Sequence, residues 1–311
     1  MFLAVVMVLL LEPFSWSTAH SALPRVDSDE VMSTINIFQA AVLGLVQGLT
    51  EFLPISSTAH LKAVPVALGW GDPGSAFSAA IQLGSIVAVL SYFWRDLTQI
   101  SRGTIDAVVS SDYHTQEFRL AMGIALGTLP ILVVGCLITV FIPNFDRSPL
   151  RSMGAIAIAS IIMGLLLGMS ERLGQHQRQL EKLSLQDSIS MGIAQAMAAI
   201  PGVSRSGSTL TAGLFLGLDR TTAARFSFLL GIPAITLAGL VKLKEALGEG
   251  LSAGNLMPLI VGILSSAIFS YVAIAGLLRY LQTKNTWVFV WYRLAFGIAI
   301  LGSIVLGWVK N

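Results

Sequence analysis

The sequence has few charged residues and almost no cysteine. Asp, Glu, Lys and Arg make up 12% of its 311 residues, roughly half of the ~25% that is usual in soluble domains. The 19 basic residues are scattered through the loops instead of forming a basic patch, which excludes a nucleic-acid-binding protein. The single cysteine, Cys136, lies in an apolar run, so there is neither a disulfide framework nor a cysteine-based metal site.

The sequence is rich in long apolar runs. Hydrophobic residues make up 54% of the chain, and the mean hydropathy is +0.77. Six runs approach the roughly 20 residues that a transmembrane helix needs, so we predict an all-α polytopic membrane protein with six full transmembrane helices. These runs are Ala76–Trp94, Phe118–Ile142, Leu150–Ser170, Ala223–Val241, Leu256–Leu281 and Trp287–Val309. The last contains Arg293, which is either a buried cation or a snorkelling side chain.

The first 34 residues stand outside this pattern. The apolar stretch 2–11 is too short to span a bilayer, and small residues typical of a signal-peptidase site follow it, but no basic residue precedes it. A cleaved leader, an uncleaved extension and a misassigned start all remain open for residues 1–34. We expect a single membrane-embedded catalytic domain over residues 35–311, with repeat halves at about 35–143 and 150–309.

Two further apolar segments, 35–70 and 187–218, are interrupted by polar and helix-breaking residues. Pro54 breaks the first segment, and Pro201-Gly-Val-Ser-Arg-Ser-Gly-Ser208 forms the non-helical centre of the second. Irregular backbone at membrane depth is tolerated only where protein or a water-filled cavity satisfies it. We therefore predict that each segment folds as a re-entrant helical hairpin.

The two interrupted segments are similar to each other. Gln47 stands seven residues before Pro54 and Gln195 stands six residues before Pro201, with serines after each proline. Self-similarity around two broken helices is typical of an internal repeat whose functional site lies at the repeat interface.

Loop charges indicate how the two repeats are oriented. With six spans and two hairpins that each return to their own side, ten basic residues fall on one face and five on the other. The positive-inside rule makes the richer face cytoplasmic, so the first hairpin enters from outside and the second from the cytoplasm, which is an inverted-topology repeat. The ten are Arg95, Arg102, Arg119, Arg172, Arg178, Lys182, Arg220, Arg225, Arg279 and Lys284, and the five are Arg147, Arg151, Lys242, Lys244 and Lys310.

Glu51 is the clearest candidate for chemistry in the first hairpin. It is the only carboxylate between Glu30 and Asp72, and a charge inside a membrane segment costs roughly 2.5–3.5 kcal/mol even on the lenient insertion scale. Gln47 lies four residues earlier, on the same face of a helix. The alternative to a catalytic Glu51 is a structural hydrogen bond between the hairpins.

A second helix begins with hydroxyls at Ser56, Ser57 and Thr58, where side chains and free amides can hold an anion. His60 follows about one turn after Ser57, and a neutral imidazole exchanges protons near pH 7. Together with the carboxylate, these groups are the parts of a phosphoryl-transfer site. The alternatives are ordinary helix capping for the hydroxyls and a core position for His60.

Arg205 is the clearest single residue of the second segment. It is flanked by Ser204, Ser206 and Gly207 at a helix start. Its guanidinium fork and the backbone amides around it are what diphosphate oxygens require. The alternative is a salt bridge between Arg205 and Glu51.

Two motifs resemble a known family. Glu51-Phe-Leu-Pro-Ile-Ser-Ser-Thr-Ala-His60 and Pro201-Gly-Val-Ser-Arg-Ser-Gly-Ser208 resemble the signature motifs of the bacterial undecaprenyl-diphosphate phosphatases, the bacitracin-resistance family, and the resemblance covers about Ile35 to Val309. It implies a multi-pass enzyme of the bacterial plasma (inner) membrane whose active site faces outside. Such an enzyme hydrolyses undecaprenyl diphosphate to undecaprenyl phosphate and phosphate, and so regenerates the lipid carrier for peptidoglycan synthesis. The resemblance also implies bacitracin resistance and a divalent cation, Mg²⁺ or Ca²⁺, as cofactor.

The resemblance assigns catalytic roles to Glu51, Ser57, His60 and Arg205, with Glu51 also as the metal ligand. Gln47 stands at a position that is Glu in many members, which weakens direct metal binding there. We expect Ser57 to be the nucleophile with His60 as its base, or else a water activated by Glu51 or His60. The expected substrate-binding residues are Gln47, Ser56, Thr58, Ser204, Ser206 and Gly207.

A rival hypothesis comes from the architecture, because inverted repeats are also found in transporters. The chain would then be a transporter or flippase of a lipid phosphate. Having Ser57 and His60 on one helical face favours the enzyme, since transport needs only a bound anion and two accessible states. The expected partners are undecaprenyl diphosphate and membrane lipid, and the sequence leaves the oligomeric state open between a monomer and a homodimer.

Overall fold

The structure, a computed structural model, describes residues 35–70, 73–142, 145, 148–248 and 256–309. Within these residues the protein is built from helices and contains no β-strand beyond one isolated bridge, between Arg178 and Leu218. The predicted all-α class is therefore confirmed. The alternatives for residues 1–34 lie outside the described residues.

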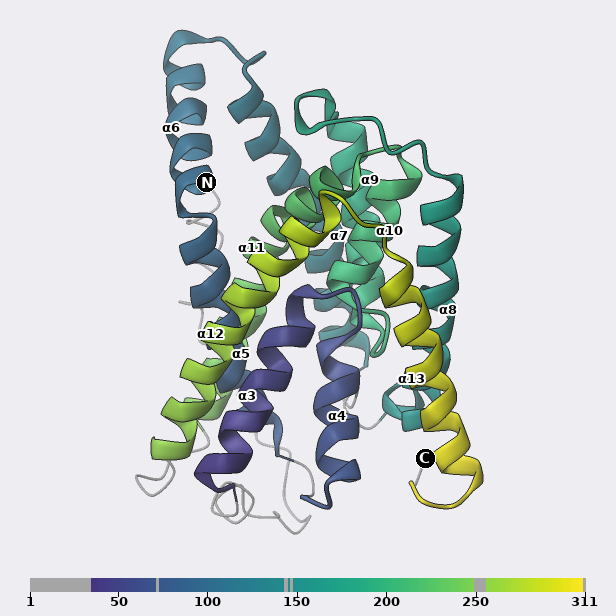
Figure 1. Cartoon of the computed structure of the whole chain (residues 1–311). Helices are drawn as coiled ribbons and strands as arrows, with labels where there is room; N and C mark the ends of the chain where they lie inside the picture. The colour runs from purple at the N-terminus through teal and green to yellow at the C-terminus, as the bar shows by residue number, and fades with distance from the viewer. Residues whose placement is uncertain (1–34, 71–72, 143–144, 146–147, 249–255, 310–311) are drawn as a thin grey trace.

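Both interrupted segments fold as helix–break–helix units, and their breaks lie side by side. Figure 1 shows the two breaks in the middle of the molecule, with the first unit opening toward one end and the second toward the other. The first unit consists of α3 (Ile37–Phe52) and α4 (Ser57–Ala67). The second consists of α9 (Leu185–Ala196), the short 3₁₀ helix η4 (Met197–Ala199) and α10 (Arg205–Phe215).

Five helices are long and apolar enough to cross a membrane. They are α7 (Gln116–Phe141), α8 (Met153–Leu173), α11 (Arg220–Gly248), α12 (Leu256–Leu281) and α13 (Trp287–Val305). A sixth span is obtained only if α5 (Ser75–Tyr92) is counted together with α6 (Trp94–Ser110), to which it is joined at a bend of 64°. The described chain therefore has five to six candidate spans.

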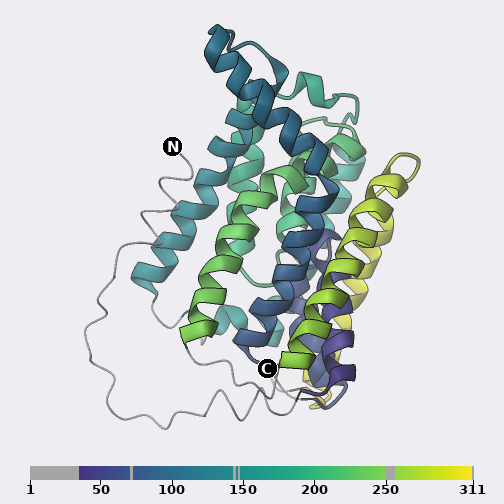
Figure 2. The same cartoon turned by 90° about the vertical axis from the view of Figure 1, so that its left-hand side faces the viewer.

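Helix α6 differs from the sequence-based expectation, which treated residues 95–117 as a loop. The segment is an amphipathic helix: Leu97 and Ile100 contact the core and Ala107 is buried, whereas Arg95 and Arg102 are exposed. A search for long apolar runs overlooks such a helix because its polar face lowers the mean hydropathy. Figure 2 shows α6 and the start of α7 extending beyond the other helices.

Capping residues mark the starts of α3 and α9, the helices that precede the two breaks. The Asn36 side chain accepts a hydrogen bond from the Gln39 amide at 2.9 Å, and the Gln39 side chain accepts one from the Asn36 amide at 3.0 Å, which forms a capping box at the start of α3. Ser184 and Asp187 form the same arrangement at the start of α9. Local sequence therefore fixes where each unit begins.

Helix α11 forms the centre of the bundle and touches both units. Residues from Ala223 to Ile235 supply much of the main core cluster. Phe228 makes an edge-to-face contact with Phe52 at 5.4 Å and another with Phe93 at 6.2 Å between ring centroids. Since Phe52 is the last residue of α3, this contact fixes the end of the helix that carries Glu51.

Ion pairs between buried carboxylates and half-buried arginines join the helix ends on the side where α9 begins. Glu171, at the end of α8, accepts from Arg220 Nε at 2.8 Å and from Thr286 Oγ1 at 2.7 Å, so one carboxylate joins α8, the start of α11 and the residue before α13. Arg178 pairs with Asp187 at the start of α9. These contacts anchor the second unit at its open end.

Glycines allow α3 and α5 to approach α12 closely. A Cβ atom on Gly48 would lie 2.6 Å from the Ser266 carbonyl oxygen, and one on Gly84 would lie 2.2 Å from the Ile263 carbonyl oxygen. Such small residues let membrane helices pack backbone to backbone. The position of α3, and with it Glu51, depends on this contact.

We expect Gly48→Ala to lower the free energy of unfolding by about 1–3 kcal/mol, because the methyl group would overpack the α3–α12 contact. Thermal unfolding of the purified protein in detergent measures the effect as a lower Tm. Gly276→Ala, on α12 with no atom within 4 Å of the added Cβ, is the matched control and should leave Tm unchanged or raise it. Equal Tm values for the two variants would contradict the close contact.

Candidate active site

The two breaks have the same backbone conformation at their capping serines. Ser56 has φ 74° and ψ 101°, and Ser204 has φ 74° and ψ 118°. Each side chain accepts a hydrogen bond from the amide three residues later, that of Ala59 at 3.4 Å and that of Gly207 at 3.1 Å. A positive φ at a residue other than glycine costs about 1–3 kcal/mol and persists only where the surroundings impose it. The two turns therefore have the same local backbone conformation and the same type of serine cap.

Arg293 holds these two turns together. Its Nη1 donates to the Pro54 carbonyl at 3.0 Å, its Nη2 to the Gly202 carbonyl at 2.7 Å, and its Nε to the Ser160 carbonyl at 3.1 Å. Pro54 and Gly202 each stand two residues before a capping serine, so the guanidinium binds the same position of both turns. The side chain is 1% exposed, which identifies Arg293 as a buried cation and not a snorkelling one.

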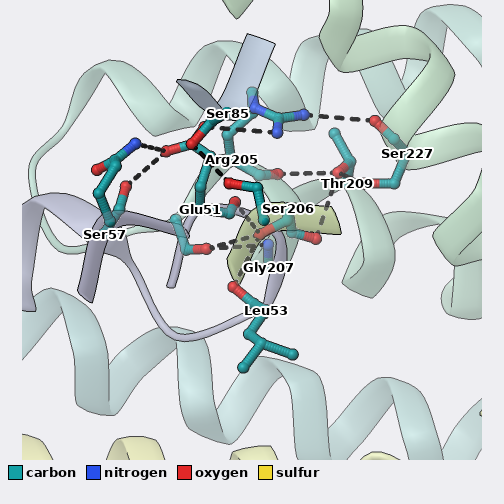
Figure 3. Close-up of polar contacts among 12 residues, drawn as sticks. Glu51, Leu53, Ser57, Ser85, Arg205, Ser206, Gly207, Thr209 and Ser227 are labelled. Atoms are coloured by element: carbon teal, nitrogen blue, oxygen red, sulfur yellow. Dashed lines mark hydrogen bonds and ion pairs between the residues drawn. The ribbon is translucent and has the colours of Figure 1, made fainter. Parts of the chain in front are cut away.

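Ser206 provides a second link between the turns. Its hydroxyl lies within donating distance of the Leu53 carbonyl, at 3.0 Å, and of the Glu51 carbonyl, at 3.3 Å (Figure 3). The hydroxyl of Ser204 lies 3.3 Å from that of Ser206 and also accepts from the amide of Gly207. Three of the expected substrate-binding residues therefore use these groups to assemble the turns.

Glu51 is the centre of the polar cluster between the units. Its Oε2 accepts from Gln47 Nε2 at 3.1 Å and from Ser57 Oγ at 2.8 Å, and its Oε1 lies 3.6 Å from Arg205 Nη2 (Figure 3). The side chains of Glu51 and Arg205 are 9% and 11% exposed. The structure thus brings together four of the predicted site residues, a carboxylate, an amide, a hydroxyl and a guanidinium.

Two of the three guanidinium nitrogens of Arg205 make no hydrogen bond to the described residues. Its Nη1 donates to the Ser227 carbonyl at 3.4 Å, while Nε and Nη2 are buried with no hydrogen-bond partner among the described residues. Gly231 makes room for the guanidinium, because a Cβ there would lie 1.7 Å from Nη1. Guanidinium donors that make no hydrogen bond within the described residues, beside the hydroxyl of Ser57, are suited to an oxyanion.

His60 lies beside this cluster but has other partners. Its Nδ1 is 2.7 Å from the Ser56 carbonyl and its Nε2 is 2.6 Å from the Tyr292 hydroxyl, and its ring stacks on Phe296 with centroids 4.3 Å apart. A carbonyl only accepts, so Nδ1 carries the proton and Nε2 accepts from Tyr292. The expected pairing of Ser57 with His60 is not present, because the hydroxyl of Ser57 donates to Glu51 instead.

The remaining predicted substrate-binding residues have different surroundings. Ser56 is buried, with its hydroxyl capping α4 and its carbonyl bound to His60. Thr58 is exposed, and no side-chain hydrogen bond of Thr58 is seen within the described residues. Neither hydroxyl joins the cluster around Glu51.

The cluster lacks the ligands for a metal cage made by protein alone. The described residues contain no group of three or more His, Cys, Asp or Glu side chains that could hold a metal ion. Beside Glu51 lies the hydroxyl oxygen of Ser57, whereas Gln47 presents its Nε2 to the carboxylate. Mg²⁺ is commonly bound through one or two carboxylates together with substrate phosphates, and this donor set fits an ion shared in that way.

Sequence reasoning found the members of the Glu51 cluster but did not predict the contacts that Arg293 and Tyr292 make around it. The signal for Arg293 was a lone cation in an apolar span, which left its burial undecided. Tyr292 has no signal of its own in the sequence. Its contact with His60 joins residues that are 232 positions apart.

We expect Arg293→Lys to lower Tm strongly, by about 2–4 kcal/mol of unfolding free energy, because one ammonium group cannot serve three carbonyls and leaves buried acceptors unpaired. Thermal unfolding in detergent measures this loss. Arg279→Lys, an exposed arginine at the end of α12, is the control and should keep the wild-type Tm. If the two variants unfold at the same temperature, the guanidinium does not hold the turns together.

Comparison with known proteins places the chain in one family. Residues 40–299 match the family described as bacitracin resistance protein BacA. The chain is 65% identical over 277 residues to an undecaprenyl-diphosphatase of Nostoc sp. (strain PCC 7120), covering 89% of this chain and 87% of that protein. It is 59% identical over 288 residues to an undecaprenyl-diphosphatase of Trichodesmium erythraeum, covering 93% of this chain and 91% of that protein. With the matched residues including both breaks and the Glu51 cluster, this chain belongs to the bacitracin resistance protein BacA family.

Proposed function

We propose that this protein is a membrane-embedded undecaprenyl-diphosphatase. It hydrolyses undecaprenyl diphosphate to undecaprenyl phosphate and inorganic phosphate, which regenerates the lipid carrier for cell-wall synthesis and supports bacitracin resistance. The names of its relatives support this substrate. The observation that carries the chemistry is the 2.8 Å hydrogen bond from Ser57 Oγ to Glu51, beside a guanidinium with two donor atoms that make no hydrogen bond to the described residues.

In the proposed mechanism Ser57 is the nucleophile and Glu51 is its base. The Ser57 oxygen attacks the terminal phosphorus as its proton passes to Glu51 Oε2. The bond from the terminal phosphorus to the bridging oxygen breaks, and its electron pair leaves with undecaprenyl phosphate. A water molecule then hydrolyses the phosphoserine, releasing phosphate and restoring the hydroxyl. Direct attack by a water activated by Glu51 is the alternative.

Arg205 stabilises the charge that develops on the transferring group. Its Nε and Nη2 are the donors available for phosphoryl oxygens. Glu51, with the hydroxyl oxygen of Ser57, would hold a Mg²⁺ or Ca²⁺ ion, and a bound ion would supply charge neutralisation there. His60 takes a positioning role, because its ring nitrogens hold the Ser56 carbonyl and the Tyr292 hydroxyl and so orient the turn that carries Ser57.

We also propose that the two units are re-entrant hairpins of an inverted-topology repeat. Their opposite directions in Figure 1 and the matching capping serines support this arrangement. The ten-to-five bias of loop charges supports an orientation in the bacterial plasma membrane in which the first hairpin enters from outside. Substrate would then reach Glu51 from the outer face.

The test of the proposed function is phosphate release from undecaprenyl diphosphate by the purified protein in detergent. A transporter of lipid phosphates would bind the lipid but release no phosphate, and detergent removes the second compartment that transport requires. Release at the rate expected of an enzyme, with kcat on the order of 1 s⁻¹ or above, supports the phosphatase. No release at any concentration of Mg²⁺ or Ca²⁺ refutes it.

We expect Glu51→Gln to lower kcat by about 10²–10⁴-fold, since the amide keeps the shape of the side chain but cannot accept the proton of Ser57. Ser57→Ala should cause a similar loss, and mass spectrometry of quenched wild-type reactions should detect phosphate on Ser57. Thr139→Val is the control, because that exposed side chain on α7 stands outside the cluster and should keep wild-type kcat. Activity of Ser57→Ala close to wild type, without phosphoserine in the wild type, favours direct attack by water.

Orientation is tested by labelling of single cysteines made in a Cys136→Ala background. Leu68, at the end of α4, and Lys182, before α9, are exposed residues at opposite ends of the bundle. A membrane-impermeant thiol reagent added to intact cells should label Leu68→Cys, whereas Lys182→Cys should react only after permeabilisation. The reverse pattern would place the Glu51 hairpin on the cytoplasmic side.

A further inference from the structure

Gln195, near the end of α9, is a buried amide without a partner. Its side chain is 0% exposed, and neither Nε2 nor Oε1 has a hydrogen-bond partner in the part of the chain that the structure describes. Buried polar groups are nearly always paired, and leaving both ends of an amide unpaired is costly. A hydrophobic residue of similar size would remove that cost, so the amide calls for an explanation.

The register of the two turns gives Gln195 a counterpart. Gln195 stands nine residues before the capping Ser204, and Gln47 stands nine residues before the capping Ser56. Both glutamine side chains are buried. The two glutamines thus occupy equivalent positions in the two units.

The same register relates the other members of the cluster. Ser57 and Arg205 are the first residues of α4 and α10. In the first unit, Gln47 and Ser57 both donate to the Glu51 carboxylate. In the second unit the residue equivalent to Glu51 is Ala199, which has no polar side chain. The second unit therefore keeps the two flanking side chains but has no carboxylate of its own between them, and the carboxylate near Arg205 is that of Glu51 in the first unit.

The unpaired atoms agree with this comparison. Among the described residues, the buried side-chain atoms without a hydrogen-bond partner include Nε and Nη2 of Arg205 as well as both polar atoms of Gln195. These are the side chains that the register places where Ser57 and Gln47 bind a carboxylate in the first unit. An anionic oxygen at the place equivalent to the Glu51 carboxylate would give both side chains a hydrogen-bond partner.

We propose that Gln195 and Arg205 together form a phosphoryl-binding site in the second unit, and that Gln195 is a substrate-contacting residue of this enzyme. The proposal rests on the proposed function. Gln195 Nε2 donates to an oxygen of the terminal phosphoryl group, and Oε1 accepts from its P–OH group, which the phosphate product also carries. Gln195 is fully buried in this structure, so its contact with the phosphoryl group requires a rearrangement of the side chains packed around it.

The first test replaces the amide by an apolar side chain of similar length, Gln195→Met. Removal of an unpaired buried amide should leave Tm equal to that of the wild type or higher. At the same time kcat/KM for undecaprenyl diphosphate should fall about 10- to 100-fold, as expected for loss of a hydrogen bond to a charged group. A residue with only a structural role would not lose activity while the protein keeps or gains stability.

The second test replaces the amide by a carboxylate of the same shape, Gln195→Glu. If the side chain lies beside Arg205, the new charge pairs with the guanidinium, so Tm should not fall, and it blocks the phosphoryl site, so kcat/KM should fall at least as far as in Gln195→Met. If Gln195 is remote from Arg205, the variant buries an unpaired charge and Tm should drop by many degrees. The sign of the Tm change therefore reports the placement of the amide.

Thr236→Val is the matched control, because the Thr236 hydroxyl on α11 is another buried group without a partner and lies outside the matched positions. It should keep wild-type kcat/KM. The proposal is overturned if Gln195→Met keeps kcat/KM within twofold of the wild type, or if neither Gln195 variant folds. Failure of the wild type to release phosphate would instead refute the proposed function, so the two failures are distinguishable.

Discussion

The candidate site depends on one buried guanidinium, that of Arg293. Burying a cation in a membrane protein is costly unless its donors are paired. Here three carbonyl oxygens accept from it, two of them from the equivalent positions of the two turns. This contact sets the register of the turns. Glu51 from the first unit and Arg205 from the second then meet, although 154 positions separate them in the sequence.

The two turns share a backbone conformation but carry different functional groups. In the second turn the hydroxyls of Ser204 and Ser206 make contacts within and between the turns, which leaves the guanidinium of Arg205 as its chemical group. In the first turn Ser56 caps the helix, and Ser57 is free to donate to Glu51. A repeat with identical side chains in both turns would supply two hydroxyls or two cations at the centre. Divergence of the first residue after each capping serine supplies one of each.

The sequence predicted the parts of the molecule that have a local signal. The breaks follow from Pro54 and from the glycine- and serine-rich segment at 201–208, and the Glu51 cluster follows from polar residues in apolar surroundings. Helix α6 was missed because its signal is an amphipathic period and not an apolar run. The partners of His60 and Arg293 were missed for another reason. His60 contacts a tyrosine that is distant in the sequence, and Arg293 binds backbone carbonyls. No pattern of side chains in the sequence predicts either kind of contact.

The charges at the turns explain why a neutral residue suits position 47. Glu51 and Arg205 balance each other, whereas Arg293 has no acidic partner among the described residues, so the turns carry about one excess positive charge. In a site of low dielectric this excess favours an anionic diphosphate over neutral lipid. A carboxylate in place of Gln47 would cancel the excess and would raise the demand for a bound cation. Gln47 keeps the hydrogen bond to Glu51 without that charge, and so leaves more of the attraction for substrate to the protein's own arginines.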